Sequence, residues 1–178
     1  MKILYFTTGL ASGGAERVVC RLADHYADLG YEVVIASLKT QLEILPFNSN
    51  INVIDLAMEK KTPFHIMRAI FRAINLIRTF KPDIVHSHMY HANIFARLLS
   101  IIFPSKRLIC SAHSNVEGGL LCDILYRLTD HIPSISTNVS QSACNSFFIR
   151  KASSPSRMIA VPNGIDISRY RGGYSPHR

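Results

Sequence analysis

The 178-residue sequence contains no tryptophan, only four cysteines and few acidic residues. Its cysteines, Cys20, Cys110, Cys122 and Cys144, form no C-x-x-C pair and have no histidine at zinc-finger spacing, so a metal site is not expected. They lie among apolar residues, so we expect them to be small buried side chains in a protein of a reducing compartment. The sequence has no window of about 18 uncharged apolar residues and no hydrophobic region typical of a signal peptide. It therefore predicts neither a membrane span nor secretion.

The shortage of acidic residues leaves the chain strongly basic. Asp and Glu number 12 against 20 Lys and Arg, so the formal net charge is +8 and the isoelectric point is about 9.6. A positive field favours an anionic partner, such as a lipid surface, a phosphorylated substrate or a nucleic acid, or serves solubility alone. Helix-turn-helix, zinc-binding and aromatic RNA-binding patterns are missing, so nucleic acid is not expected as the partner.

Short apolar runs alternate with longer helical patterns along the chain. The sequence predicts strands over residues 3–6, 32–38, 51–56, 83–86, 107–112, 132–138 and 157–161. It predicts helices over residues 15–29, 63–80, 91–103, 119–129 and 140–150. This alternation is typical of an α/β fold, with right-handed βαβ units and a mostly parallel sheet covered on both faces. Residues 171–178 lack periodicity and are expected to form a loop or disordered tail, so the domain spans residues 1–170.

A glycine-rich loop joins the first predicted strand to the first predicted helix. Gly13 and Gly14 expose backbone N–H groups at a helix N-terminus, where a phosphate or a sugar oxygen can be held, although a tight turn without a ligand has the same pattern. Glu16 lies on the first helical turn, either as a ligand contact or as a charge that stabilises the helix dipole. The spacing is not G-x-G-x-x-G, and the second strand has no terminal acidic residue. A nucleotide-binding oxidoreductase is therefore only the alternative enzyme class.

Histidines gather around the ends of the fourth and fifth predicted strands. His86 and His88 alternate, so both point to one face of the sheet. No nearby carboxylate or cysteine accompanies them, so we expect no metal; His88 is expected to face a cleft. His113 is expected at the carboxyl edge of the sheet, as a hydrogen-bonding imidazole or as a packed loop residue. On the helix after His88, Asn93 and Arg97 are expected to be structural.

Four segments together resemble the N-terminal half of a family 4 glycosyltransferase, an enzyme of the GT-B fold with two facing Rossmann-like domains. In chain order they are Gly13-Gly14-Ala15-Glu16, residues 85–93 with Ala96-Arg97, Ser111-Ala112-His113-Ser114, and residues 161–166 with Arg169-Tyr170. The resemblance spans about residues 1–170. It implies a Rossmann-like three-layer domain that forms a single lobe, on the acceptor side, of a GT-B enzyme.

The resemblance also implies a reaction and a set of site residues. A sugar would pass from a nucleoside-diphosphate donor to a hydroxyl acceptor, with retention and without an obligatory metal or other cofactor. His113 would be the catalytic residue that contacts the transferred sugar. Donor or acceptor contacts would come from Gly13, Gly14, Glu16 and His88, and from Asn163 and Gly164 in the turn that crosses to the donor-binding domain.

The family's donor-binding domain has no counterpart in this sequence. Because a transferase cleft needs groups from two domains, we expect the chain alone to lack activity. It is then either a truncated enzyme or an acceptor- or membrane-binding subunit whose donor domain is a separate chain. The expected partners are a nucleotide-sugar donor and a lipid-linked or saccharide acceptor from cell-surface polysaccharide or glycolipid synthesis.

The predicted helix over residues 63–80 is basic and amphipathic. Its apolar residues at helical spacing are Ile66, Met67, Ile70, Phe71, Ile74 and Ile77. Such a helix covers the sheet, contacts an anionic membrane surface, or does both. Similar enzymes with lipid-linked acceptors dock their N-terminal domain on the bilayer. The expected location is therefore cytoplasmic, including the inner face of the membrane.

Overall fold

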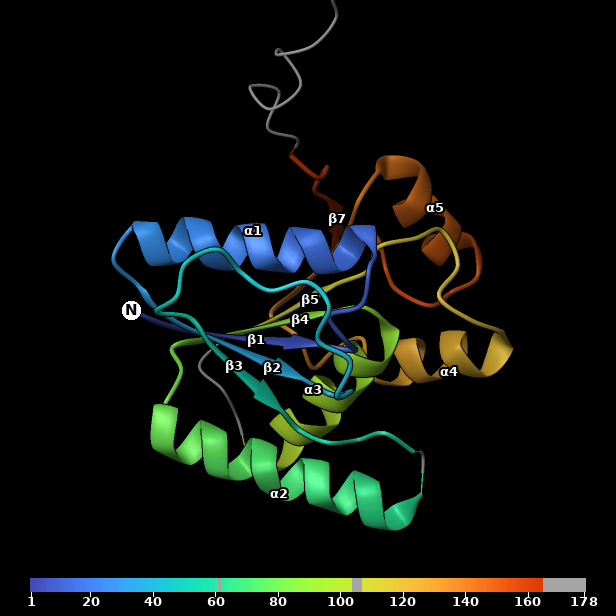
Figure 1. The fold of residues 1–178 in the computed structure, drawn as a ribbon. Coiled ribbons are helices and arrows are strands. Elements are labelled where there is room, and N and C mark those ends of the chain that lie inside the picture. Colours follow the sequence, from blue (N-terminus) through green and yellow to red (C-terminus); the bar gives the residue numbers. More distant parts are fainter. Residues whose placement is uncertain (61, 104–106, 165–178) are drawn as a thin grey trace, which may run out of the picture.

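The computed structural model describes residues 1–60, 62–103 and 107–164. Seven parallel strands form one sheet in the order β3-β2-β1-β4-β5-β6-β7, with helices on both faces (Figure 1). The strands are β1 (Lys2–Thr7), β2 (Glu32–Ser37), β3 (Asn52–Asp55), β4 (Ile84–His88), β5 (Leu108–Ser111), β6 (Ile135–Asn138) and β7 (Met158–Ala160). The helices are α1 (Gly14–Asp28), α2 (Pro63–Phe80), α3 (Tyr90–Ile102), α4 (Leu120–Leu128) and α5 (Gln141–Ile149). The predicted α/β, Rossmann-like architecture is confirmed.

The element boundaries differ from prediction at two informative places. Strand β6 begins at Ile135 rather than at residue 132, because Pro133 has no N–H for the ladder. Strand β4 continues to His88 rather than ending at His86, which places His88 inside the sheet. The predicted tail and the end of the predicted domain, residues 165–178, lie outside the described residues.

The parallel register divides the strand residues between two faces. Leu4, Val85 and Leu108 are neighbours across β1, β4 and β5, and they belong to the core beneath α2 and α3. Tyr5 and His86, which are one residue further along, point to the opposite face, where α1 packs on β1 and β2. Within the described residues, the main helix contacts of β4 to β7 come from α3 and α5 on the first face. The second face of these four strands therefore lies open beside α1.

Helix α2 packs only part of the predicted apolar stripe against the core, since Ile70, Ile74 and Ile77 contact it and other members do not. Thr62 caps the helix by accepting the His65 N–H, and Pro63 occupies the first turn. The fully buried side of the helix is made by Ala69, Ala73 and Leu76. Met67 and Phe71, expected on the apolar stripe, are exposed instead. The predicted stripe is thus split between the core and the outer surface.

Candidate functional site

A cavity of about 300 Å³ lies between α1 and the open face of β4 to β6. His86, His88 and His113 line it, and Asn163 and Gly164 line it from the segment after β7. Further lining side chains come from α1, from β5 and β6, and from the residues directly after β6 and β7: Val18, Leu22, Tyr26, Ile109, Ser111, Ile135, Thr137, Asn138, Val139 and Val161. No Asp, Glu, Lys or Arg is among these described lining residues. The cavity therefore suits a neutral group that carries hydroxyls better than it suits a phosphate.

The register of the sheet brings the histidines together. His88 pairs with Ser111 across β4 and β5, so His86 and His88 share the open face, as predicted. The ring centroids of His86 and His88 lie 4.1 Å apart. His113, two residues beyond Ser111, faces them, with Nε2 2.9 Å from Nδ1 of His88. His88 is 1% exposed, so it contacts His113 from beneath rather than lying at the surface.

Burial keeps the three imidazoles neutral at neutral pH. It lowers the pKa of His86 to about 3, and it lowers the pKa of His88 well below its ordinary value and that of His113 as well. His86 Nε2 lies 2.7 Å from the Ser111 hydroxyl, which lies 2.7 Å from that of Thr137. Among the described residues, no three His, Cys, Asp or Glu side chains form a metal-binding group. The cluster is a set of neutral hydrogen-bonding groups.

A half-buried carboxylate holds the backbone of His113. Glu117 Oε1 accepts the main-chain N–H of His113 at 2.9 Å, and Oε2 accepts the hydroxyl of Tyr126. Asn93 Nδ2 donates to that same hydroxyl and to the carbonyl of Ser111. Burial raises the pKa of Glu117. The loop after β5 is thus tied to α3 and α4 from the interior.

Arg97 lies fully buried beside this network. Its guanidinium donates to the Tyr126 carbonyl, the Thr129 hydroxyl and the Ser136 hydroxyl, and it lies 4.7 Å from the centroid of the Tyr126 ring. These bonds join α3, α4 and β6. Arg97 and Asn93 are structural, as the sequence indicated.

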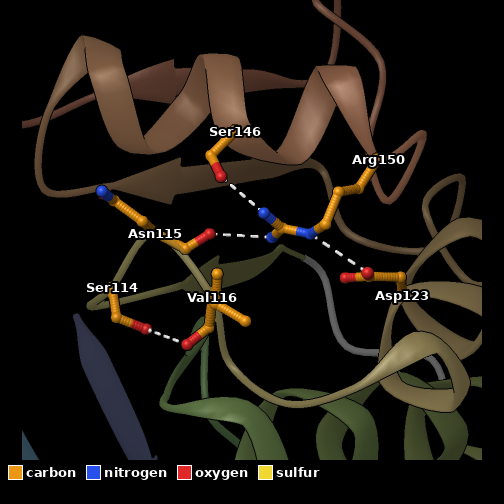
Figure 2. A network of polar contacts seen from close by, with 6 residues as sticks. All are labelled: Ser114, Asn115, Val116, Asp123, Ser146 and Arg150. Atoms are coloured by element: carbon orange, nitrogen blue, oxygen red, sulfur yellow. Dashed lines mark hydrogen bonds and ion pairs between the residues drawn. The ribbon is translucent and has the colours of Figure 1, made fainter.

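A second charged residue holds the same loop from outside. Arg150 donates from Nε to Asp123 at 3.0 Å and from its guanidinium to the Asn115 carbonyl at 2.8 Å and to Ser146 (Figure 2). Within the loop, the Ser114 hydroxyl donates to the Val116 carbonyl. Sequence reasoning missed both Arg150 and Glu117. No local motif could have found Arg150, because its loop partner lies 35 residues away.

The glycine loop lies apart from the cavity. Gly13 is the N-cap of α1, and a Cβ there would lie 2.2 Å from Glu16 Oε2, so the carboxylate folds back over the helix N-terminus. This geometry favours the interpretation of Glu16 as a charge on the helix dipole. Gly14 is exposed, with open space around it. Neither glycine lines the cavity, although Val18, on the next turn, does.

The sequence matches the family model of Glycosyltransferase Family 4 over residues 12–169. No curated protein matches it significantly. Among solved structures, HepE of Anabaena in complex with UDP and glucose superposes with a TM-score of 0.73 at 16% identity, over 96% of this chain and 46% of that one. A glycosyltransferase from Rickettsia africae superposes with a TM-score of 0.74 at 17% identity, over 98% of this chain and 46% of that one.

The lipopolysaccharide outer core galactosyltransferase WaaB is a further similar structure. It superposes with a TM-score of 0.70 at 13% identity, over 94% of this chain and 47% of that one. Identities this low show a shared fold alone. The chain spans about half the length of each of these three proteins.

Proposed function

The chain belongs to glycosyltransferase family 4, and on that premise we propose that it is the acceptor-side lobe of a retaining enzyme. The enzyme moves a sugar from a nucleoside-diphosphate donor to a hydroxyl acceptor in cell-surface polysaccharide or glycolipid synthesis. The chain is inactive until a donor-binding lobe, as part of a longer polypeptide or as a separate one, completes the cleft. The fold similarity to two-lobed glycosyltransferases and the half-length match support this division.

The observation that carries this proposal is the position of His113. It follows β5 at the carboxyl edge of a parallel sheet, which is where open α/β sheets bind ligands. It lines an uncharged cavity together with Asn163 and Gly164. A neutral imidazole there offers a hydrogen bond to a sugar oxygen without competing for the donor's phosphates. Gly13 and Gly14, at the N-terminus of α1, are then left to contact the donor diphosphate across the completed cleft.

Reconstitution tests the proposal. The purified chain is assayed with a panel of nucleotide sugars, alone and with a donor-binding lobe supplied as a second polypeptide. We expect turnover only in the combined sample. In that sample His113→Ala should lower kcat about 100-fold, the usual order for losing one transition-state hydrogen bond, and His113→Asn should lower it less. Turnover by the chain alone would contradict the two-lobe proposal, and full activity of His113→Ala would contradict the role of His113.

We also propose peripheral attachment to the anionic inner face of the membrane, from the cytoplasm, through the outer side of α2. None of the described helices is long and apolar enough to cross a bilayer. On α2, however, Phe64, Met67 and Phe71 are exposed by 70%, 48% and 65%, and the helix contains no acidic residue. Its arginines Arg68 and Arg72 flank these side chains in sequence. An apolar ridge with cationic neighbours is typical of a helix that lies at a lipid interface.

A further inference from the structure

A second cavity, of about 350 Å³, lies between α1 and the segment that joins β2 to β3. Its lining residues are Arg17, Cys20, Arg21 and Asp24 from α1, and Glu43, Ile44, Leu45 and Phe47 from the segment. The α1 residues recur at intervals of three and four, so they share one face of the helix. The histidine cavity is lined by a different set of α1 residues, Val18, Leu22 and Tyr26. The two cavities therefore share no lining residue.

The segment that forms one wall of this cavity is anchored to α1. Both carboxylate oxygens of Asp24 accept main-chain N–H groups, from Phe47 at 3.1 Å and from Asn48 at 2.9 Å. The Cys20 thiol donates to the Ile44 carbonyl, with the sulfur 3.8 Å from the oxygen. Burial raises the pKa of this thiol to about 11, so it is uncharged at pH 7. The cavity is therefore preformed, and its charges come from arginines and carboxylates alone.

The two arginines of the cavity have no partner for their charges. Arg17 and Arg21 lie one turn apart on α1, and among the described residues neither guanidinium makes a hydrogen bond or an ion pair. The two carboxylates of the lining have other partners, since Asp24 binds main-chain N–H groups and Glu43 accepts Gln41 Nε2 at 2.7 Å. Like charges four residues apart destabilise a helix. An anion bound between the guanidinium groups would relieve this repulsion.

We propose that this cavity binds the phosphoryl group of a phosphate ester through Arg17 and Arg21. A guanidinium presents paired N–H groups that match two phosphate oxygens, and two cations match the charge of a phosphate monoester at neutral pH. Leu45 and Phe47 are exposed by 54% and 78% and, with Ile44, give the cavity an apolar wall for the organic part of the ester. The site is separate from the histidine cavity, so it does not rest on the proposed function.

A phosphate ester can reach this cavity from solution or as the headgroup of a lipid. Helix α1 covers the opposite face of the sheet from α2 (Figure 1). A bilayer that contacts the outer side of α2 would therefore lie on the far side of the sheet from Arg17 and Arg21. For this reason we expect the ligand to be a soluble ester, and the experiment includes both sources.

Calorimetric titration of the full chain with phenyl phosphate, at low salt and neutral pH, tests the site. We expect saturable binding that is tighter than that of inorganic phosphate, because the ring contacts the apolar wall. The Arg17→Gln, Arg21→Gln double variant should bind phenyl phosphate at least about tenfold more weakly, since it loses charge-assisted hydrogen bonds. The matched control is Arg72→Gln, Arg78→Gln on α2, which removes the same charge from exposed positions and should bind as the wild type does. Equal losses in the two double variants would overturn the proposal.

The carboxylate of Glu43 provides a test of opposite sign. Glu43→Gln removes a negative charge from the lining, so it should strengthen binding of phenyl phosphate. Circular dichroism checks that each variant is folded, and Arg17→Gln alone, at an exposed position, decides if the double variant is not. Absence of saturable binding to the wild type, or equal affinity for inorganic and phenyl phosphate, would contradict the site or its apolar wall. Binding to phosphatidate vesicles that depends on the two arginines, without binding of phenyl phosphate, would overturn the soluble source in favour of a lipid headgroup.

Discussion

Glu117 and His113 form a hydrogen bond that joins the carboxylate to a main-chain N–H four residues earlier, at 2.9 Å. The same carboxylate accepts the Tyr126 hydroxyl, so one half-buried side chain satisfies two donors. The loop after β5 therefore depends on an interior acceptor rather than on its own turn geometry.

Removal of the Glu117 carboxylate should destabilise the fold more than its neutralisation. Glu117→Ala leaves both the His113 N–H and the Tyr126 hydroxyl without an acceptor, and we expect a loss of about 2–4 kcal/mol of unfolding free energy. Glu117→Gln keeps a carbonyl oxygen for His113, so its loss should be about 1 kcal/mol. Urea denaturation of both variants measures the difference. Equal losses would show that the two hydrogen bonds contribute little.

The Met89→Gly variant should be more stable than the Met89→Ala variant. Its backbone lies at φ 70° and ψ 157°, a region that residues with a Cβ rarely adopt, directly after His88 and at the N-cap of α3. Alanine retains this strain, whereas glycine removes it. Met89→Gly should therefore exceed Met89→Ala by about 1 kcal/mol in unfolding free energy, although glycine ordinarily costs unfolded-state entropy.

The Met89 pair is compared by thermal and urea denaturation. Because both variants lose the same side chain beyond Cβ, packing losses cancel to first order. Ala57 also has a positive φ of 56°, which makes Ala57→Gly an independent check of the same effect. A Met89→Ala chain as stable as Met89→Gly would mean that the backbone relaxes without strain.

As the pH is lowered, the chain should begin to lose stability at a higher pH than titration of its carboxylates alone would predict. Burial lowers the pKa of His86 in the folded state from 6.5 to about 3. Between these two pH values the unfolded state therefore binds a proton at His86 that the folded state does not bind. The stability contributed by neutral His86 is complete above pH 6.5 and falls as the pH decreases from 6.5 towards 3. His88 and His113 act in the same direction, since burial lowers the pKa of each. Glu117 acts in the opposite direction, because its folded pKa is raised above 4.5.

Urea midpoints measured from pH 7.5 to pH 4 give this dependence. His86→Gln removes the titrating ring and keeps an amide near the position of Nε2, which contacts Ser111. The slope of unfolding free energy against pH should decrease by up to one proton in this variant between pH 6 and 4. The same slope in both proteins would mean that His86 is protonated in the folded state.

Loss of the exposed phenylalanines of α2 should weaken membrane binding. A Phe64→Ser, Phe71→Ser double variant should lower the partition coefficient onto vesicles rich in anionic lipid at least about tenfold, because it removes two large apolar contacts. Sedimentation with vesicles measures the partition. The control is the same substitution at Phe47, which is 78% exposed and whose main-chain N–H donates to Asp24 of α1. Helix α1 covers the opposite face of the sheet from α2 (Figure 1).

Salt provides a second readout for the same surface. Added salt should weaken binding of both the wild type and the double variant, because the basic residues are screened. Binding that is insensitive to the α2 substitutions, or equally lost in Phe47→Ser, would place the lipid contact elsewhere.

Local sequence predicted much of the fold because its signals are local. Strand β1 and helix α1 follow from an apolar run, a glycine loop and helical spacing that ends before Gly30. Alternation placed His86 and His88 on one face, since period two is a property of any strand. The division of the α2 stripe was not predictable in this way, because Met67 and Ile70 have the same character in sequence and differ only in which neighbours lie against them.

The sequence by itself determined the parallel α/β layers, the family, and the presence of His113 at the end of the fifth strand. These features could be predicted because periodicity and short motifs depend only on residues that are close together in the sequence. Only the tertiary structure decided that His88 is buried against His113, and that Glu117 and Arg150 hold the loop between them. These contacts join residues up to 35 positions apart, and their atoms meet only once the strands are in register and the helices have packed. Packing, and not local preference, therefore determines which hydrogen bonds His113 makes.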